Sequence, residues 1–184
     1  MAFEAGKNKP MPRSAAREKY SLWLMPRAHL CERLTQTLHR LSVRYNAPEF
    51  PPHVTLLGNC IGSRSELIRQ SARLAGSIRP FVIRLEAIDF LDEFFRCLFV
   101  RAALTKSLRQ VHRVACQAFG RRREPPFMPH LSLLYGSFSR TLKRDLTAEL
   151  GPRIDAQFKV RDLHLYRTHG QPHLWRRVAS FELK

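Results

Sequence analysis

Apolar and polar positions along the chain predict a strand, two amphipathic helices and two further strands in the first hundred residues. An apolar run at 20–25, closed by Pro26, is typical of a buried strand. Leucines then recur at helical spacing over 29–45. Ser63-Arg64-Ser65-Glu66 matches a capping box and predicts a helix up to Gly76. Alternation predicts a strand hairpin over 81–90 and 95–101.

The second part of the chain repeats this order of elements. Apolar residues at three- and four-residue intervals predict a helix over 104–118, and a proline-containing loop follows it. Ser139 is placed to cap a helix up to Leu150, and strands are expected at 154–167 and 174–183. The repeated order predicts two similar α+β lobes, whose motif strands face each other across a groove. The alternative is one irregular α+β domain with a chance repeat.

A short motif occurs at the corresponding place in each half. The first copy is Pro52-His53-Val54-Thr55-Leu56-Leu57-Gly58, and the second is Pro129-His130-Leu131-Ser132-Leu133-Leu134-Tyr135-Gly136, 77 residues later. Side chains at i and i+2 of a strand share one face. Each motif strand should therefore present a histidine and a hydroxyl side chain on one face, with apolar residues behind them.

Composition indicates a basic globular protein. The 184 residues are 44% hydrophobic, which is sufficient for a core that needs no disulfide or metal cross-links. The net charge is +17. Such a charge attracts polyanions, and arginine binds phosphate with two hydrogen bonds. A nucleotide or RNA ligand and a merely basic surface both remain open. Residues 1–19 are predicted to be a disordered basic arm, and 20–184 the folded domain.

No apolar run is long enough to span a membrane, and the N-terminus lacks a signal-peptide core. We therefore expect a soluble, monomeric, cytoplasmic protein with no membrane contact, and the charge also allows the nucleus. The chain has four widely spaced cysteines and no C-x-x-C pair; they are Cys31, Cys60, Cys97 and Cys116. We expect them to be reduced thiols, and a disulfide between two of them is the alternative. No metal site and no cofactor are predicted, because zinc-site and phosphate-loop motifs are lacking.

Two histidines with two hydroxyl side chains suit acid–base chemistry on a phosphodiester. One imidazole can act as base while the other, protonated, acts as acid. The hydroxyl groups can donate hydrogen bonds to an anion between them. A cyclic phosphodiester fits this layout, since its hydrolysis needs an activated water on one side of phosphorus and a protonated leaving oxygen on the other.

The tetrapeptides His53-Val54-Thr55-Leu56 and His130-Leu131-Ser132-Leu133 resemble the signature of the 2H phosphoesterase superfamily. Within it the chain most resembles the cyclic phosphodiesterase family of plants and yeast, over about Tyr20 to Lys184. The resemblance rests further on 21–26, on Leu133-Leu134-Tyr135-Gly136 and on a C-terminal strand with Trp175.

This resemblance implies a bilobal α+β fold with two antiparallel-sheet lobes, outer helices and a central groove. It also implies metal-independent hydrolysis of ADP-ribose 1″,2″-cyclic phosphate and nucleoside 2′,3′-cyclic phosphates, reactions linked to tRNA splicing and RNA metabolism. His53 and His130 would be the catalytic pair, Thr55 and Ser132 the phosphate-binding residues, and Tyr135 a ring beside the substrate. Trp23 and Trp175 are interpreted as core residues, and the other histidines as structural or surface residues.

Two alternatives remain. The first is a 2H-type enzyme that acts on RNA ends, either on 2′,3′-cyclic phosphates or on 2′-5′ linkages, and the high charge favours it. The second is a nucleotide- or RNA-binding module without catalysis. The presence of both histidines and both hydroxyl residues speaks against this second reading.

Overall fold

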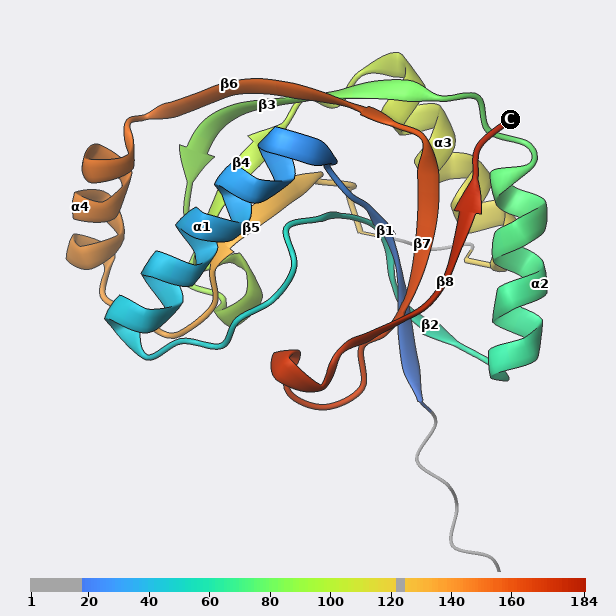
Figure 1. The fold of residues 1–184 in the computed structure, drawn as a ribbon, viewed down its shortest axis with the longest axis horizontal. Coiled ribbons are helices and arrows are strands. Elements are labelled where there is room, and N and C mark those ends of the chain that lie inside the picture. Colours follow the sequence, from blue (N-terminus) through green and yellow to red (C-terminus); the bar gives the residue numbers. More distant parts are fainter. Residues whose placement is uncertain (1–17, 122–124) are drawn as a thin grey trace, which may run out of the picture.

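One antiparallel sheet runs through the part of the chain that the computed structural model describes, residues 18–121 and 125–184 (Figure 1). Its strand order is β6-β3-β4-β5-β2-β1-β7-β8. The strands are β1 (Lys19–Leu24), β2 (Val54–Ile61), β3 (Phe81–Asp89), β4 (Leu98–Ala102), β5 (His130–Leu134), β6 (Arg153–Val160), β7 (Asp162–Arg167) and β8 (Arg176–Glu182). The helices are α1 (Ala28–Tyr45), α2 (Arg64–Ala75), α3 (Lys106–Ala118) and α4 (Arg140–Leu150).

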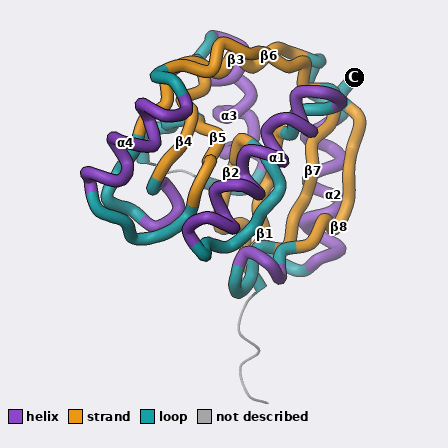
Figure 2. Tube along the Cα trace, turned by 60° about the vertical axis from the view of Figure 1, so that its left-hand side comes forward, coloured by secondary structure: helices purple, strands orange, loops and turns teal. Residues whose placement is uncertain are grey.

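The two predicted lobes are the halves of this sheet. One half is β5-β4-β3-β6 and the other is β2-β1-β7-β8, and they join where β2 pairs with β5 at Val54 and Leu131. The two motif strands are thus neighbours at the centre of one sheet, instead of facing each other from separate sheets. The sheet is strongly curved, as Figures 1 and 2 show, so its halves turn toward each other.

Helices α1 and α3 each pack on a strand of the other repeat. Helix α1 follows β1 in sequence but packs on β5, and α3 follows β4 but packs on β2. Helix α2 packs on β7 and β8, next to α3 (Figure 1). Each motif strand is therefore supported by the helix of the other repeat, which ties the two repeats into one core.

Local sequence explains where most helices begin. The hydroxyl oxygens of Ser63 and Ser139 accept hydrogen bonds from backbone amides in the first turns of α2 and α4, as predicted. Thr105 does the same for α3. Leucines of α1 at 34, 38 and 41 are buried, which confirms the predicted apolar face.

Two predicted strands differ in the structure. The segment 154–167 divides at Arg161 into β6 and β7, which lie in opposite halves of the sheet. The hairpin strand predicted from Phe95 begins only at Leu98, because 94–96 form a 3₁₀ turn. Apolar alternation does not reveal either break, since the residues on both sides of each break stay suited to strands.

The predicted arm lies almost entirely outside the described residues, which begin at Glu18, and β1 starts at Lys19. All four cysteines lie within the described residues, and Cys31 and Cys97 are free thiols. Across the described ranges, none of the helices combines the length and the hydropathy that a membrane crossing requires.

Candidate active site

The two motifs meet where β2 and β5 pair. Val54 and Leu131 are partners in this antiparallel pair and are fully buried on the core side. Because side chains alternate along a strand, the residues on either side of each partner point to the opposite face. Thr55 then lies on the His130 side of the pair, and His53 on the side of Ser132. All four side chains line one cleft of about 540 Å³.

Each imidazole is held by the backbone just before it. The Nδ1 atom of His53 is 2.7 Å from the carbonyl oxygen of Pro51, and Nδ1 of His130 is 2.9 Å from that of Met128. A carbonyl oxygen can only accept, so both Nδ1 atoms carry a proton. In the neutral rings Nε2 is then the free basic nitrogen, as in other histidines oriented through Nδ1.

His53 lies in an aromatic environment. Its ring stacks on Trp23 with centroids 3.6 Å apart, and Phe50 lies edge-on to it. Only 5% of His53 is exposed. Burial lowers the pKa of His53 to about 4, and the nearby His130 lowers it further, while the hydrogen bond to Pro51 acts in the opposite direction. The His53 imidazole is therefore neutral near pH 7.

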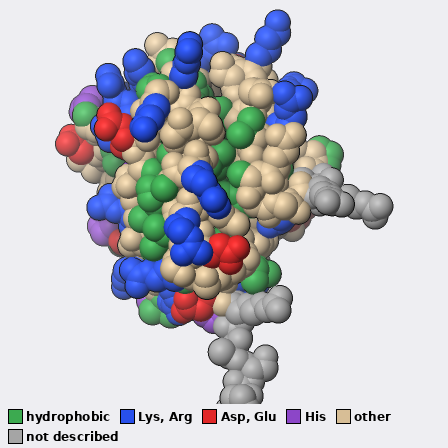
Figure 3. All heavy atoms as spheres, turned by 90° about the vertical axis from the view of Figure 1, so that its right-hand side faces the viewer, with side chains coloured by type: hydrophobic (Ala, Val, Ile, Leu, Met, Phe, Trp, Pro, Cys, Tyr) green, Lys and Arg blue, Asp and Glu red, His purple; other side chains and the backbone are tan. Residues whose placement is uncertain are grey.

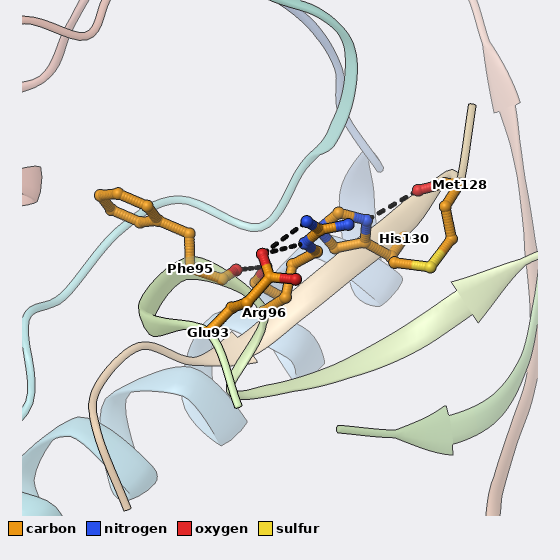
Figure 4. A network of polar contacts seen from close by, with 6 residues as sticks. Glu93, Phe95, Arg96, Met128 and His130 are labelled. Carbon is orange, nitrogen blue, oxygen red and sulfur yellow. Dashed lines mark hydrogen bonds and ion pairs between the residues drawn. The ribbon is translucent and has the colours of Figure 1, made fainter. Parts of the chain in front are cut away.

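His130 is less enclosed and has charged neighbours. Burial lowers the pKa of His130, the Arg96 and Arg101 cations add to this effect, and Glu93 together with the Met128 carbonyl opposes it. Figure 4 shows Arg96 beside the His130 ring, with its guanidinium paired to Glu93. The Nε of Arg96 is 2.8 Å from the Glu93 carboxylate. Because its ring is less enclosed, His130 takes up a proton more easily than His53.

The two hydroxyl residues have different surroundings. Thr55 is half-buried and lines the cleft. Ser132 is buried, and its Oγ donates to the carbonyl oxygen of Phe95 at 3.1 Å. The Ser132 hydroxyl therefore anchors the turn that carries Phe95 and Arg96, a contact that the motif alone does not reveal.

Tyr135 is found in the cleft wall, but its hydroxyl group is deeply buried. Its ring stacks on Phe50 at 3.7 Å and lies edge-on to Phe95. Burial raises the pKa of Tyr135. The residue therefore supplies an aromatic surface and cannot serve as an ionised group.

Sequence reasoning missed several cleft residues. Trp23 is buried as expected of a core residue, yet it also lines the cleft and stacks on His53. Trp175 lines the cleft with Phe95, and their ring centroids are 6.0 Å apart. His169, interpreted as a structural or surface residue, also belongs to the lining. Ser21 also lines the cleft, and Trp23 lies two residues from it on the same strand face, which is the signal that the sequence offers for Trp23.

The residues of the cleft offer no metal-binding cluster. Within 18–121 and 125–184, no group of three or more histidine, cysteine or acidic side chains is arranged to hold a metal ion. The arrangement can bind an anion between two imidazoles, move protons on both sides of it and hold flat groups against aromatic rings.

Comparison with known proteins identifies the family. The model of the 2′-5′ RNA ligase superfamily matches residues 26–172, which include both motifs. The chain belongs to this superfamily. It is the 2H phosphoesterase superfamily that the two tetrapeptides predict, and membership supports phosphoesterase activity as the general class.

Relatives of this superfamily agree in sequence and fold. The cyclic phosphodiesterase of Arabidopsis thaliana is 22% identical over 129 residues, which are 70% of this chain and 71% of the plant protein. E. coli LigT in its apo form matches with a TM-score of 0.62 and 16% identity, over 92% of this chain and 99% of LigT. TT0787 of Thermus thermophilus gives 0.61 and 15%, over 90% and 97%. These structures confirm the predicted α+β 2H fold.

Proposed function

We propose that this member of the superfamily is a metal-independent cyclic phosphodiesterase with His53 and His130 as its catalytic pair. One observation carries the proposal. The pairing of β2 with β5 brings two imidazoles to one cleft, each with Nδ1 bonded to a backbone carbonyl and Nε2 left for chemistry. The substrates are ADP-ribose 1″,2″-cyclic phosphate and nucleoside 2′,3′-cyclic phosphates.

The different surroundings divide the work between the histidines. His53, the more buried ring, accepts a proton from water, and the water oxygen forms a bond to phosphorus. The bond from phosphorus to one ribose oxygen breaks, and protonated His130 gives its Nε2 proton to that oxygen. The product is a phosphomonoester, and protons and charges balance without a further reactant.

The neighbouring groups bind and orient the phosphate. The Thr55 hydroxyl group donates a hydrogen bond to a non-bridging oxygen of the phosphate. Ser132 can do so only if its proton turns away from Phe95, so its main role is to hold the turn with Arg96 at the cleft. Tyr135 and Trp175 supply ring surfaces for the sugar or base.

Nucleotide complexes of a relative fit this proposal. E. coli LigT structures with 3′-AMP and with NADP⁺ superimpose on this chain with TM-scores of 0.60 and 0.61. The test is hydrolysis of both cyclic phosphates in excess EDTA, with the product isomer identified. Turnover that survives EDTA is expected. No turnover of either compound, with or without added divalent metal, would contradict the proposal.

A second candidate is an enzyme acting on RNA ends. The cationic residues Lys19 and Arg96 on the cleft, together with the net charge of +17, favour a longer polyanion. Competition by a short RNA separates the two, because an enzyme specific for mononucleotides should keep its rate at physiological salt.

A further inference from the structure

The outer face formed by α2 and α3 is strongly and one-sidedly basic. The two helices carry six exposed cationic side chains, Arg64, Arg69, Arg73, Lys106, Arg109 and Arg113, and a single carboxylate, Glu66. Figure 3 shows this side of the molecule, where blue Lys and Arg side chains are spread over the surface and few red ones lie among them. Within the described part of the chain, none of the six forms an ion pair.

The helices on the other half of the sheet are charged differently. Arg44 of α1 pairs with Glu149 of α4 at 2.8 Å, and the buried Lys143 pairs with Asp92. Part of the positive charge is therefore neutralised there. Helices α1 and α4 carry three carboxylates among their cationic residues, Glu32, Asp145 and Glu149, whereas α2 and α3 carry Glu66 alone. Helices α2 and α3 adjoin the half of the sheet that carries His53.

A groove beside α2 and the end of α3 adjoins the active-site cleft. It has a volume of about 530 Å³, is lined by the end of β2, by Glu66 and Gln70 of α2 and by Phe119 and Arg121 after α3, and shares Asn59 with the cleft. Arg121 donates to the carbonyl oxygens of Gly58 and Asn59, both at 3.1 Å, so it fixes the junction of cleft and groove.

We propose that the α2–α3 face is a binding surface for the phosphate backbone of an RNA chain whose end occupies the cleft. The inference rests on the proposed function, because it takes the cleft as the place where a cyclic phosphate end reacts. It makes oligoribonucleotides, beyond single nucleotides, the substrate class of this enzyme. The contacts are to phosphates and carry no base sequence preference.

The dimensions fit such a chain. Helix α2 has 12 residues and α3 has 13, so each is about 18–20 Å long at 1.5 Å per residue. A face of this length offers contacts to several successive phosphates of an RNA strand.

The surface fits RNA better than an anionic membrane. Membrane-surface helices expose large apolar side chains beside their basic ones. Neither α2 nor α3 has an exposed large hydrophobic side chain, because residues such as Leu67, Leu74 and Leu108 are buried in the core. The connection to the cleft is a second reason, since a bilayer cannot follow a groove of this size.

The test compares two variants with equal charge changes. The face variant combines Arg69→Gln, Arg73→Gln and Arg113→Gln. The control combines Arg33→Gln, Arg40→Gln and Arg144→Gln, which are exposed residues of α1 and α4. Binding of a ten-nucleotide RNA with a 3′-phosphate is measured over a salt series, and turnover of a nucleoside 2′,3′-cyclic phosphate is measured beside it.

The face variant is expected to bind the RNA about 10- to 100-fold more weakly at low salt. Its plot of log K against log salt should flatten by about 2, since each lost phosphate contact removes about 0.7 from the slope for a single strand. Turnover of the mononucleotide should stay within about twofold of the wild type, and the control should keep its RNA affinity.

Three outcomes would overturn the inference. The first is an equal loss of RNA affinity in both variants, and the second is unchanged RNA binding in the face variant. The third comes from a parallel measurement with vesicles of anionic lipid, if the face variant loses binding to the vesicles and keeps its binding to RNA. Because RNA binding is read without catalysis, an inactive protein would contradict the proposed function and still leave this test decisive.

Discussion

At the scale of single residues, the two histidines of the site differ by their neighbours. His53 is enclosed by Trp23 and Phe50, whereas His130 lies near Glu93 and Arg96. Both pKa values are lowered, with that of His53 at about 4. The motif does not distinguish the two histidines. Only the packing around each ring makes His53 suited to act as a base and His130 as an acid.

This difference predicts an acidic pH optimum for kcat/KM. The base His53 must be neutral, so activity falls as pH drops through about 4, the pKa of that ring. The acid His130 must be protonated, and its pKa lies below the ordinary imidazole value of 6.5, so activity falls as pH rises through that lower value. A pH–rate series on a nucleoside cyclic phosphate should give a bell with its maximum below about pH 6.5. A flat profile from about pH 5 to 8 would contradict the assignment.

The hydroxyl groups of Thr55 and Ser132 should respond differently to removal. Thr55→Val keeps the shape of the side chain and loses a hydrogen bond to the charged phosphate, so kcat/KM should fall by about 10- to 100-fold. Ser132→Ala releases the Phe95 carbonyl and should mainly raise KM. Steady-state kinetics of the two variants check this difference. Equal losses of kcat would show that Ser132 binds phosphate as Thr55 does.

At the scale of elements, α4 holds the turn that brings Arg96 to the cleft. Lys143 of α4 is 2% exposed, and its Nζ donates to the Leu91 carbonyl at 3.1 Å and pairs with Asp92. The amide of Gly136 donates to the Phe94 carbonyl from the other side. A helix remote from the motifs thus positions part of the site.

Replacing this lysine should destabilise the fold. Lys143→Met leaves the Leu91 carbonyl without its charged donor, and the free energy of unfolding should fall by about 1–3 kcal/mol. The neighbouring exposed change Arg144→Met is the matched control and should stay within about 0.5 kcal/mol. Urea denaturation measures both. Equal stability of the two variants would show that the Lys143 contacts contribute nothing.

Element order was largely predictable, whereas element placement was not. Leucine spacing and capping serines located α1, α2 and α4, because these signals act within a few residues. That α1 packs on β5 and α3 on β2 depends on contacts between distant segments. The division of 154–167 into β6 and β7 has the same origin, since each part finds its partner in a different half of the sheet.

The site shows the same division. His53, Thr55, His130 and Ser132 line one cleft, as the period of two along a strand predicts. Tyr135, which the family resemblance implied, lines the same cleft. The stacking of Trp23 on His53 and the hydrogen bond from Ser132 to Phe95 join separate elements, and no local pattern contains them.

At the scale of the whole molecule, a duplicated α+β unit is joined into one curved sheet, and the motif strands meet at its centre. Helices α2 and α3, which lie beside the β2 half, carry six exposed cationic side chains and one carboxylate. Chemistry in the cleft and attraction of polyanions to the surface can therefore be changed separately by substitution.

The central claim is that His53 and His130 act together in one metal-independent reaction. The most direct test is kcat/KM for a nucleoside 2′,3′-cyclic phosphate in excess EDTA, for the wild type, His53→Ala, His130→Ala and the double variant. Each single change should lower the rate by at least about 100-fold, and the double variant should lose little more, because the two groups serve one step. Full activity in either single variant would contradict the two-histidine mechanism.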